Sequence, residues 1–326
     1  MKAVHALRFG DPDVLSLVDL PDPTPEPGQV AIDVSHAAVG LIDVFFRRGL
    51  FGGRPGFPKP PFVPGLEVAG TVRALGSGVT DLSVGERVVT FSSGGTGGYA
   101  SIVVCPRSRV FSTAAHDIDP ALAVATVPNA AMAHMALASV ARVTTGKSVL
   151  VHGALGGFAS AFPAVAKKLG ASRVIGTVRA SKLAAAAKTK LPYDRIVDSA
   201  KLLEELAGES FDVIVDPVGG VLRTQSLDLL APFGCLLLVG NASGDFDHAL
   251  PSNRLWFGCV NAAGFNAGAY VPGHEEELGA AVRGALEAAS SGLLEVEVDV
   301  LPLGAAAVAH HRMDARSLEG RIVLAP

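Results

Sequence analysis

The stretch that decides the fold is Val149-Leu150-Val151-His152-Gly153-Ala154-Leu155-Gly156-Gly157-Phe158-Ala159-Ser160-Ala161, in which an apolar strand runs into a glycine-rich turn. The residues after it, to about Leu169, have the pattern of a helix. Small residues at positions 153, 156 and 159 let the backbone approach a pyrophosphate, whose charge the N–H groups at a helix start would hold. A turn that only closes a loop is the alternative, but the flanking strand and helix favour a dinucleotide site. We therefore expect Gly153, Gly156, Gly157 and Phe158 to contact a cofactor.

The residues after the next predicted strand, at 173–178, distinguish the two nicotinamide dinucleotides. A site for NAD places a carboxylate there, whereas a site for NADP places cations that bind the 2′-phosphate. From Phe158 through Tyr193 there is no Asp or Glu but there are seven Lys or Arg residues. An ordinary solvated helix surface explains some of these cations, among them Lys167 and Lys168. We expect NADPH, with Arg179, Lys182 and the Ser181 hydroxyl as ligands of its 2′-phosphate and with Thr177 also in the cofactor site.

The chain changes character near Pro120. Before it, turn formers such as those at 22–28 separate short β-branched runs, which predicts a β-rich, partly barrel-like unit. After it, helical patterns alternate with short apolar strands, which predicts a parallel sheet covered on both faces. Because 326 residues exceed what one core usually fills, we expect two domains. The boundaries place residues 1–121 and 265–326 in one domain and residues 122–264 in the nucleotide-binding domain.

Composition excludes several classes of function. The net charge of −4 provides no basic field for nucleic acid or an anionic membrane. The three cysteines, Cys105, Cys235 and Cys259, form no CxxC pair, which excludes a disulfide framework and favours a reducing cytoplasm. The N-terminus lacks the apolar block of a signal peptide. The uncharged stretch 120–141 contains Pro128, Asn129 and His134, which fits a buried helix better than a membrane span.

With these features in place, the sequence resembles the medium-chain dehydrogenase/reductases, and within them the zinc-independent quinone oxidoreductase branch. The resemblance covers nearly the whole chain. Its marks, in order, are the stretches 42–50, 62–70, 84–88, 149–160, 216–220, 240–244 and 309–316. It implies an α/β fold with a GroES-like β-rich domain and a doubly wound Rossmann domain with a parallel sheet. It also implies a homodimer that forms through the Rossmann domain.

The resemblance allows zinc to be judged residue by residue. Zinc-dependent relatives have a Cys-His pair just before the position of Asp43 and Gly-His-Glu at the position of Gly65-Leu66-Glu67. The matching residues here are Gly40, Leu41 and Leu66, whose side chains cannot coordinate a metal. We therefore expect no metal site and a substrate that needs no Lewis acid, such as a quinone or an α,β-unsaturated carbonyl compound.

The resemblance also implies roles for single residues. Asp43 matches a position beside the nicotinamide, where it would anchor the carboxamide or relay a proton; capping of the following helix is the alternative. Arg316 would help to hold the cofactor phosphates. Asn241, Ser243 and Phe265 would line the nicotinamide side, unless they serve only turn geometry.

The sequence departs from the branch at several polar positions. Gly40, Phe45, Phe51 and Met132 stand where quinone reductases of this branch commonly have Asn, Tyr, Tyr and Thr. The substrate cleft implied by Phe45, Phe51, Phe62 and Met132 is therefore apolar, although core packing accounts for part of this set.

Three functions remain open at this stage. The first is an NADPH-dependent reductase of a small-molecule quinone or activated enone. The second is an enoyl-thioester or other double-bond reductase on the same scaffold. The third is a protein that binds NADPH without turnover, since function resides in the site rather than in the fold.

Overall fold

The computed structural model describes residues 1–326 except 53–55, 92–95, 295, 317 and 319. It divides into two compact units: Met1–Pro128 with Val282–Ser291 and Val296–Pro326, and Asn129–Ala281 with Gly292–Glu295. The boundaries differ from those expected at 121 and 264. Two of the changeovers, at 128/129 and 281/282, fall inside the helices α2 (Pro120–Met135) and α9 (Glu275–Ser290).

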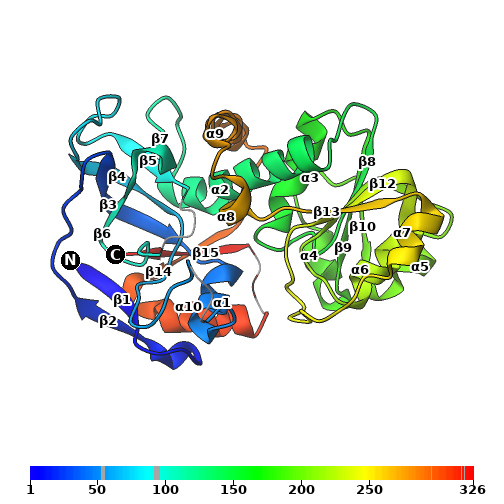
Figure 1. The fold of residues 1–326 in the computed structure, drawn as a ribbon, viewed down its shortest axis with the longest axis horizontal. Helices are drawn as coiled ribbons and strands as arrows, with labels where there is room; N and C mark the ends of the chain where they lie inside the picture. Colours follow the sequence, from blue (N-terminus) through cyan, green and yellow to red (C-terminus); the bar gives the residue numbers. More distant parts are fainter. Residues whose placement is uncertain (53–55, 92–95, 295, 317, 319) are drawn as a thin grey trace. The chain divides into compact units, whose positions relative to one another are not determined.

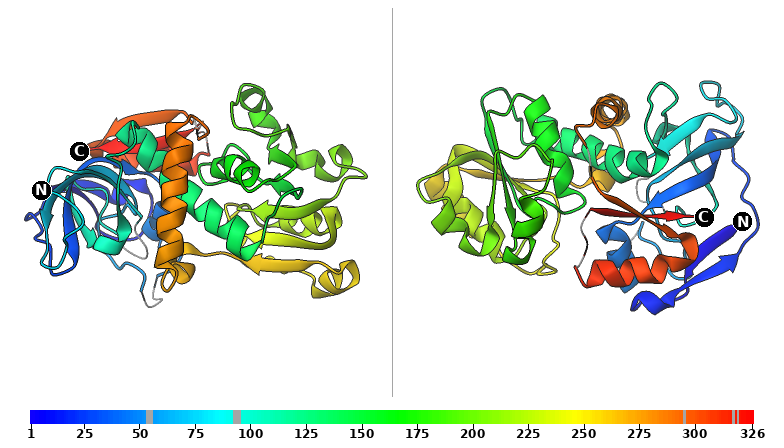
Figure 2. Two further views of the ribbon diagram at one scale, coloured as in Figure 1. Left: turned by 90° about the horizontal axis from the view of Figure 1, so that it is seen from above. Right: turned by 180° about the vertical axis from the view of Figure 1, so that it is seen from behind.

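The second unit is built on a six-stranded sheet with the order β10-β9-β8-β11-β12-β13. Every neighbouring pair in it is parallel. Its strands are β8 (Ser148–Val151), β9 (Arg173–Val178), β10 (Arg195–Asp198), β11 (Phe211–Asp216), β12 (Leu230–Leu238) and β13 (Asn261–Gly264). The helices that lie along its two faces include α3 (Phe162–Lys168), α4 (Leu183–Ala186), α5 (Leu202–Glu205), α6 (Val221–Gln225) and α7 (Ser252–Gly258) (Figures 1 and 2). This is the doubly wound arrangement that the apolar strands predict.

The strands of this sheet are apolar because helices cover both faces. Leu150, Ile214 and Leu236 have no exposed surface and belong to one core cluster. Gly176 of β9 has a second role, because a Cβ atom there would lie 2.6 Å from Cβ of Ala154. The missing side chain lets β9 lie against the turn that follows β8.

The first unit is β-rich, as expected. Its main sheet has the order β14-β15-β3-β4-β5-β7, with β6 paired to β3, and β1 and β2 form a separate antiparallel pair. The strands are β1 (Lys2–Ala6), β2 (Leu15–Asp19), β3 (Gln29–Ala38), β4 (Val68–Leu75), β5 (Arg87–Thr90), β6 (Ile102–Pro106), β7 (Val110–Ser112), β14 (Val298–Pro302) and β15 (Arg321–Ala325). Two helices, α1 (Leu41–Arg48) and α10 (Ala306–Asp314), pack against each other in this unit.

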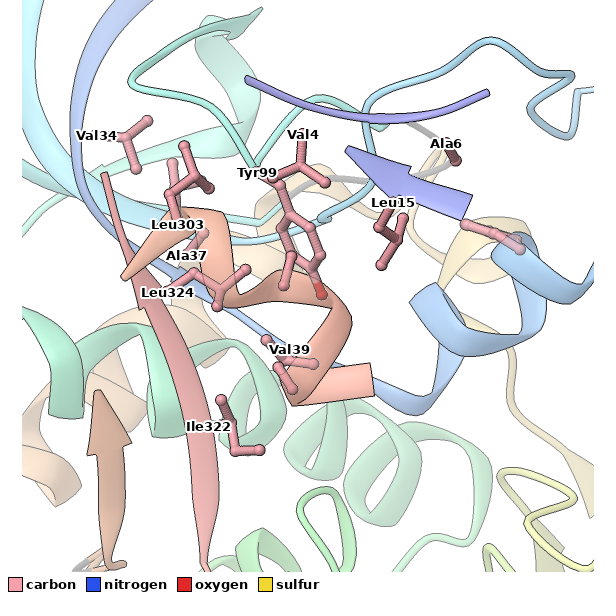
Figure 3. Close-up of a cluster of buried hydrophobic side chains, with 14 of the residues drawn as sticks. Val4, Ala6, Leu15, Val34, Ala37, Val39, Tyr99, Leu303, Ile322 and Leu324 are labelled. Carbon is pink, nitrogen blue, oxygen red and sulfur yellow. The ribbon is translucent and has the colours of Figure 1, made fainter. Parts of the chain in front are cut away.

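Tyr99 lies in the middle of the apolar core of the first unit, among Val4, Val39, Leu303 and Ile322 (Figure 3). The side chain has no exposed surface. Because a buried hydroxyl needs a hydrogen-bond partner, its position requires other polar groups inside the core.

The apolar segment Pro120–Val140, formed by α2 and the turn of π-helix after it, is long enough to cross a membrane by composition alone. However, 78% of its most apolar window is buried inside the protein. It therefore has the burial of a core helix.

Candidate functional site

The glycine turn of the second unit follows β8 directly. Gly153 has φ +65°, a left-handed conformation that glycine adopts without strain. The N–H of Gly156 then donates to the carbonyl of Gly153 at 2.7 Å, and a Cβ at position 156 would lie 3.0 Å from that oxygen. Both residues are therefore required by the tightness of the turn.

The turn also contains two backbone donors that make no hydrogen bond to the described residues. Within the described residues, the N–H groups of Gly157 and Phe158 have no acceptor. The Gly157 carbonyl is held by Asn129 Nδ2 at 2.9 Å and by the Ser160 hydroxyl at 3.2 Å, which fixes the orientation of the turn. The segment continues as a 3-10 turn (Ala159–Ala161), so the α-helix begins only at Phe162. Oriented N–H groups on a glycine turn fit an anion such as a pyrophosphate.

His152 connects this turn to two neighbouring segments. The Ser226 hydroxyl donates its single proton to the Leu222 carbonyl at 2.7 Å, so it accepts from His152 Nε2–H, also at 2.7 Å. His152 Nδ1 then accepts from the Thr177 hydroxyl at 3.1 Å. Burial lowers the pKa of His152 to about 4, against a smaller opposing effect of the Asp216 charge. The imidazole is therefore neutral.

Thr177, expected in the cofactor site, lies inside the core. Its side chain has no exposed surface and its hydroxyl is used by His152. It therefore supports the turn from inside the core, and its contact with a cofactor stays a prediction.

The three residues expected to bind the 2′-phosphate directly follow β9. Arg179, Ser181 and Lys182 lie at the start of a short 3-10 turn, where the Lys182 N–H donates to the Arg179 carbonyl at 2.8 Å. Arg179 and Ser181 are exposed and Lys182 is half-buried. Because β8 and β9 are adjacent and parallel, this group and the glycine turn follow the same edge of the sheet.

Two further loops end at this edge. Asp216, at the end of β11 and fully buried, accepts from the N–H groups of Val218 and Gly219 and pairs with Arg223 at 2.5 Å. In the loop after β12, the Ser243 hydroxyl donates to Asn241 Oδ1 at 2.8 Å. A Cβ at Gly219 would overlap that same oxygen, since it would lie 2.0 Å away. Asn241 and Ser243 therefore shape the two loops at the strand ends.

The two remaining residues that were expected to contact the cofactor are Phe265 and Arg316. Phe265 follows β13 and is buried, with its ring centroid 5.3 Å from that of Tyr270. Arg316 belongs to the first unit, just after α10, in a left-handed conformation with φ +52°.

The expected aromatic cleft residues fall into separate groups. In the first unit Phe45, Phe46 and Phe57 surround Phe51, with ring centroids between 5.0 and 6.3 Å from it. Phe62 is buried and contacts Phe9 instead, at 6.5 Å. Met132 lies on α2 in the second unit and is half-buried. We call the group of Phe45, Phe46, Phe51 and Phe57 the aromatic cluster.

Asp43 has no exposed surface. Oδ2 accepts from the Gly40 N–H at 2.8 Å and from the Tyr99 hydroxyl at 3.2 Å, and Oδ1 accepts from the Gly65 N–H at 3.1 Å. The bond to Gly40 is the helix-capping contact, so capping, the alternative left open by the sequence, is what the geometry shows. Burial raises the pKa of Asp43 to about 6, although these three donors lower it.

Four polar residues around Asp43 were not singled out from the sequence: Glu67, Tyr99, His310 and Arg321. Glu67 is partly buried, and its pKa is raised to about 7 by burial and by the Asp43 charge. Arg321 on β15 is buried, and its charge acts on both carboxyl groups. The sequence contains one indication of Glu67, because this residue lies in the stretch 62–70, on which the family resemblance partly rests.

No group of three or more His, Cys, Asp or Glu side chains that could hold a metal ion occurs in the part of the chain that the structure describes. At positions 40, 41 and 66 the residues are Gly, Leu and Leu, so these positions do not fit a metal.

Two family models match the chain: "Alcohol dehydrogenase GroES-like domain" over residues 26–115 and "Zinc-binding dehydrogenase" over residues 157–283. A quinone oxidoreductase from Lama guanicoe is 31% identical over 248 residues, which cover 74% of this chain and 73% of that protein. A 2-haloacrylate reductase from Burkholderia sp is 29% identical over 98% of this chain and 97% of its own length. The Escherichia coli quinone oxidoreductase, solved in complex with NADPH, aligns over the full length of both chains with a TM-score of 0.89 and 27% identity.

The buried neutral state of His152 predicts a pH-dependent stability of the second unit. Its pKa in the folded state, about 4, lies below the ordinary value of 6.5, so its contribution is present above pH 6.5 and is lost as the pH falls toward 4. We expect the free energy of opening to fall by up to about 3 kcal/mol over this range, relative to His152→Gln.

Hydrogen exchange of the β8 and β9 amides in both proteins, between pH 7 and pH 4, measures this difference. His274→Gln, at an exposed position of the same unit, serves as the control and should follow the wild type. A wild-type and His152→Gln difference that stays constant with pH would show that His152 is not held neutral by burial.

Proposed function

Because this chain belongs to the medium-chain dehydrogenase/reductase superfamily, in its quinone oxidoreductase-like branch, we propose that it is an NADPH-dependent reductase that transfers hydride to a quinone or activated enone without zinc. The observation that carries the proposal is the glycine turn after β8, in which the N–H groups of Gly157 and Phe158 have no acceptor within the described residues, together with Arg179, Ser181 and Lys182 after the adjacent parallel strand β9. This edge of the sheet combines a donor surface for a pyrophosphate with cations for a 2′-phosphate.

The protein residues supply binding and orientation, whereas bound NADPH supplies the hydride. Asn129 and Ser160 hold the peptide of Gly157, and His152 holds the strand end before the turn. The aromatic cluster offers an apolar surface for a flat conjugated ring. Since positions 40, 41 and 66 lack metal ligands, the proposed substrate is one whose conjugation delocalises charge without a Lewis acid.

A second candidate is reduction of an activated carbon–carbon double bond. It is supported by the similarity to the 2-haloacrylate reductase, which extends over 97% of that protein. The two candidates share the cofactor site and differ in the acceptor.

A panel of acceptors tests the proposal. We expect NADPH absorbance to decrease with substituted quinones or enones and to change less with enoyl thioesters and haloacrylates. Faster turnover of the haloacrylates would favour the second candidate. Flat traces with every acceptor, together with tight NADPH binding, would instead indicate a binding protein without turnover.

The cofactor preference gives a sharper prediction. Replacing both Arg179 and Lys182 by Ala removes charge-assisted hydrogen bonds to the 2′-phosphate, so the Kd for NADPH should rise by about 100-fold or more while that for NADH changes little. Titration of intrinsic or nicotinamide fluorescence measures both constants. Lys167→Ala is the matched control, because Lys167 is paired with Asp194 at 2.7 Å. Equal losses for the two cofactors would contradict the assignment.

We also propose that the protein is a homodimer, formed at the outer edge of β13. β13 is the end strand of the sheet, and Asn261, Ala262 and Gly264 on it are exposed. Near this edge, Phe233, Trp256 and Phe257 expose 83%, 72% and 77% of their surfaces, and the rings of Trp256 and Phe257 stack at 4.7 Å. An unprotected strand edge beside exposed aromatic rings favours pairing with a second copy of the chain.

Replacing Trp256 and Phe257 by Ser should shift the protein from dimer to monomer, because it removes the apolar surface that association would bury. Sedimentation velocity of the wild type and the variant reads out the change. Leu203→Ser, on the exposed side of α5, controls for the loss of an exposed apolar side chain in general. A wild-type protein that sediments as a monomer at micromolar concentration would overturn the proposal.

A further inference from the structure

Tyr193 connects two points of the glycine turn. It lies in the loop before β10, and its hydroxyl oxygen is 3.1 Å from the carbonyl oxygen of Ala154 and 3.3 Å from that of Ala159. A carbonyl oxygen can only accept, so the hydroxyl is the donor and shares its one proton between the two. Burial raises the pKa of Tyr193 well above its ordinary value, so the hydroxyl keeps this proton at neutral pH. One side chain therefore closes residues 154–159 into a loop.

The ring of Tyr193 reaches the turn because Gly176 on β9 has no side chain. A Cβ atom at position 176 would lie 3.1 Å from Cε1 and 3.2 Å from Cδ1 of the tyrosine ring, which is tighter than ordinary packing. The loop is also fixed beside β9, because the Asp194 N–H donates to the Val174 carbonyl at 2.8 Å. All of these residues belong to the second unit, so the contact between Tyr193 and the turn lies within one compact body.

The bond to Ala159 acts on the Gly157 N–H through the backbone. In a trans peptide group the C=O and the N–H point in opposite directions, and a hydrogen bond at one end polarises the other. The Ala159 carbonyl shares a peptide group with the Ser160 N–H, which donates to the Gly156 carbonyl at 2.8 Å. The Gly156 carbonyl in turn shares a peptide group with the Gly157 N–H, which has no acceptor within the described residues. The Tyr193 hydroxyl is thus the first donor in a chain of hydrogen bonds that leads to this N–H.

Asn129 has the same relation to the neighbouring N–H of the turn. Its Nδ2 donates at 2.9 Å to the Gly157 carbonyl, which shares a peptide group with the Phe158 N–H. Each of the two N–H groups without an acceptor in the described part of the chain is therefore supported by a side-chain donor, Tyr193 for Gly157 and Asn129 for Phe158. N–H groups that are already oriented bind an anion without the cost of ordering the turn.

We propose that Tyr193 is a positioning residue of the cofactor site, whose hydroxyl holds the glycine turn in the conformation that receives the pyrophosphate of the dinucleotide. This inference rests on the proposed function. It gives Tyr193 a different effect from that of Arg179 and Lys182. The pyrophosphate is common to NADPH and NADH, whereas the 2′-phosphate belongs to NADPH alone, so loss of the hydroxyl should weaken both cofactors equally.

Replacing Tyr193 by Phe removes the hydroxyl and keeps the ring beside Gly176. We expect the Kd for NADPH and the Kd for NADH to rise by the same factor, about 5- to 10-fold, which corresponds to one hydrogen bond. The Kd for 2′-AMP, which carries the 2′-phosphate but no pyrophosphate, should stay unchanged. Isothermal titration calorimetry of the wild type and the variant measures all three constants.

Thr189→Val is the matched control for the loss of a hydroxyl from the same loop. The Thr189 hydroxyl accepts from the Leu191 N–H at 3.3 Å, so its removal should leave all three constants at their wild-type values. An unchanged Kd for NADPH in Tyr193→Phe would overturn the positioning role. An equal loss of affinity for 2′-AMP would overturn it too, because that result would indicate a general disturbance of the fold.

Amide NMR of the protein without cofactor tests the path through the backbone. Because Phe keeps the aromatic ring, Tyr193→Phe should shift the amide nitrogen resonances of Ser160 and Gly157 and leave that of Phe158 nearly unchanged. Asn129→Leu should instead shift the resonance of Phe158. Resonances of Ser160 and Gly157 that stay in place in Tyr193→Phe would refute the path. If the wild type binds neither cofactor, the proposed function fails, and these resonances still decide whether Tyr193 orients the turn.

Discussion

Helices cover both faces of the parallel sheet in the second unit. Polar side chains that bind a ligand can therefore lie only at the ends of its strands, and the other features of this unit depend on that constraint. Leu150, Ile214 and Leu236 are fully buried, so the middle of each of these strands packs inside the core. Polar residues begin where the strands end, with His152 after β8 and Asp216 at the end of β11. The turn at 153–158 is therefore held by the loops around it as well as by its own glycines.

In the first unit, by contrast, polar side chains such as those of Asp43 and Tyr99 lie inside the core. An isolated buried carboxylate would be strongly destabilising, and Asp43 is tolerated because three segments of the chain donate hydrogen bonds to it. Tyr99 brings one of these donors through an otherwise apolar cluster (Figure 3). The contacts that hold α1 and the loop at Gly65 in place are thus the same contacts that lower the pKa of Asp43 against the effect of its burial.

Local patterns predicted the parallel sheet and the glycine turn, because apolar runs and small residues at fixed spacing have short-range causes. The role of Asp43 stayed open between catalysis and capping, since it depends on Tyr99, which is 56 residues away in the sequence. Tyr99, His310 and Arg321 were not recognised for the same reason, because only tertiary packing brings them to one place. The burial of the Thr177 side chain could not be predicted, because a strand buried on both sides has no polar alternation to show which way each side chain points.

The close approach of Gly176 to Ala154 has a consequence for how such proteins diverge. Since a Cβ on one residue would lie within 2.6 Å of the methyl group on the other, the two positions share a single small volume. In homologous sequences we expect an alanine at the position of Gly176 to occur together with a glycine at the position of Ala154. Enlarging both together would force the β9 backbone outward and shift Arg179 and Lys182 relative to the glycine turn.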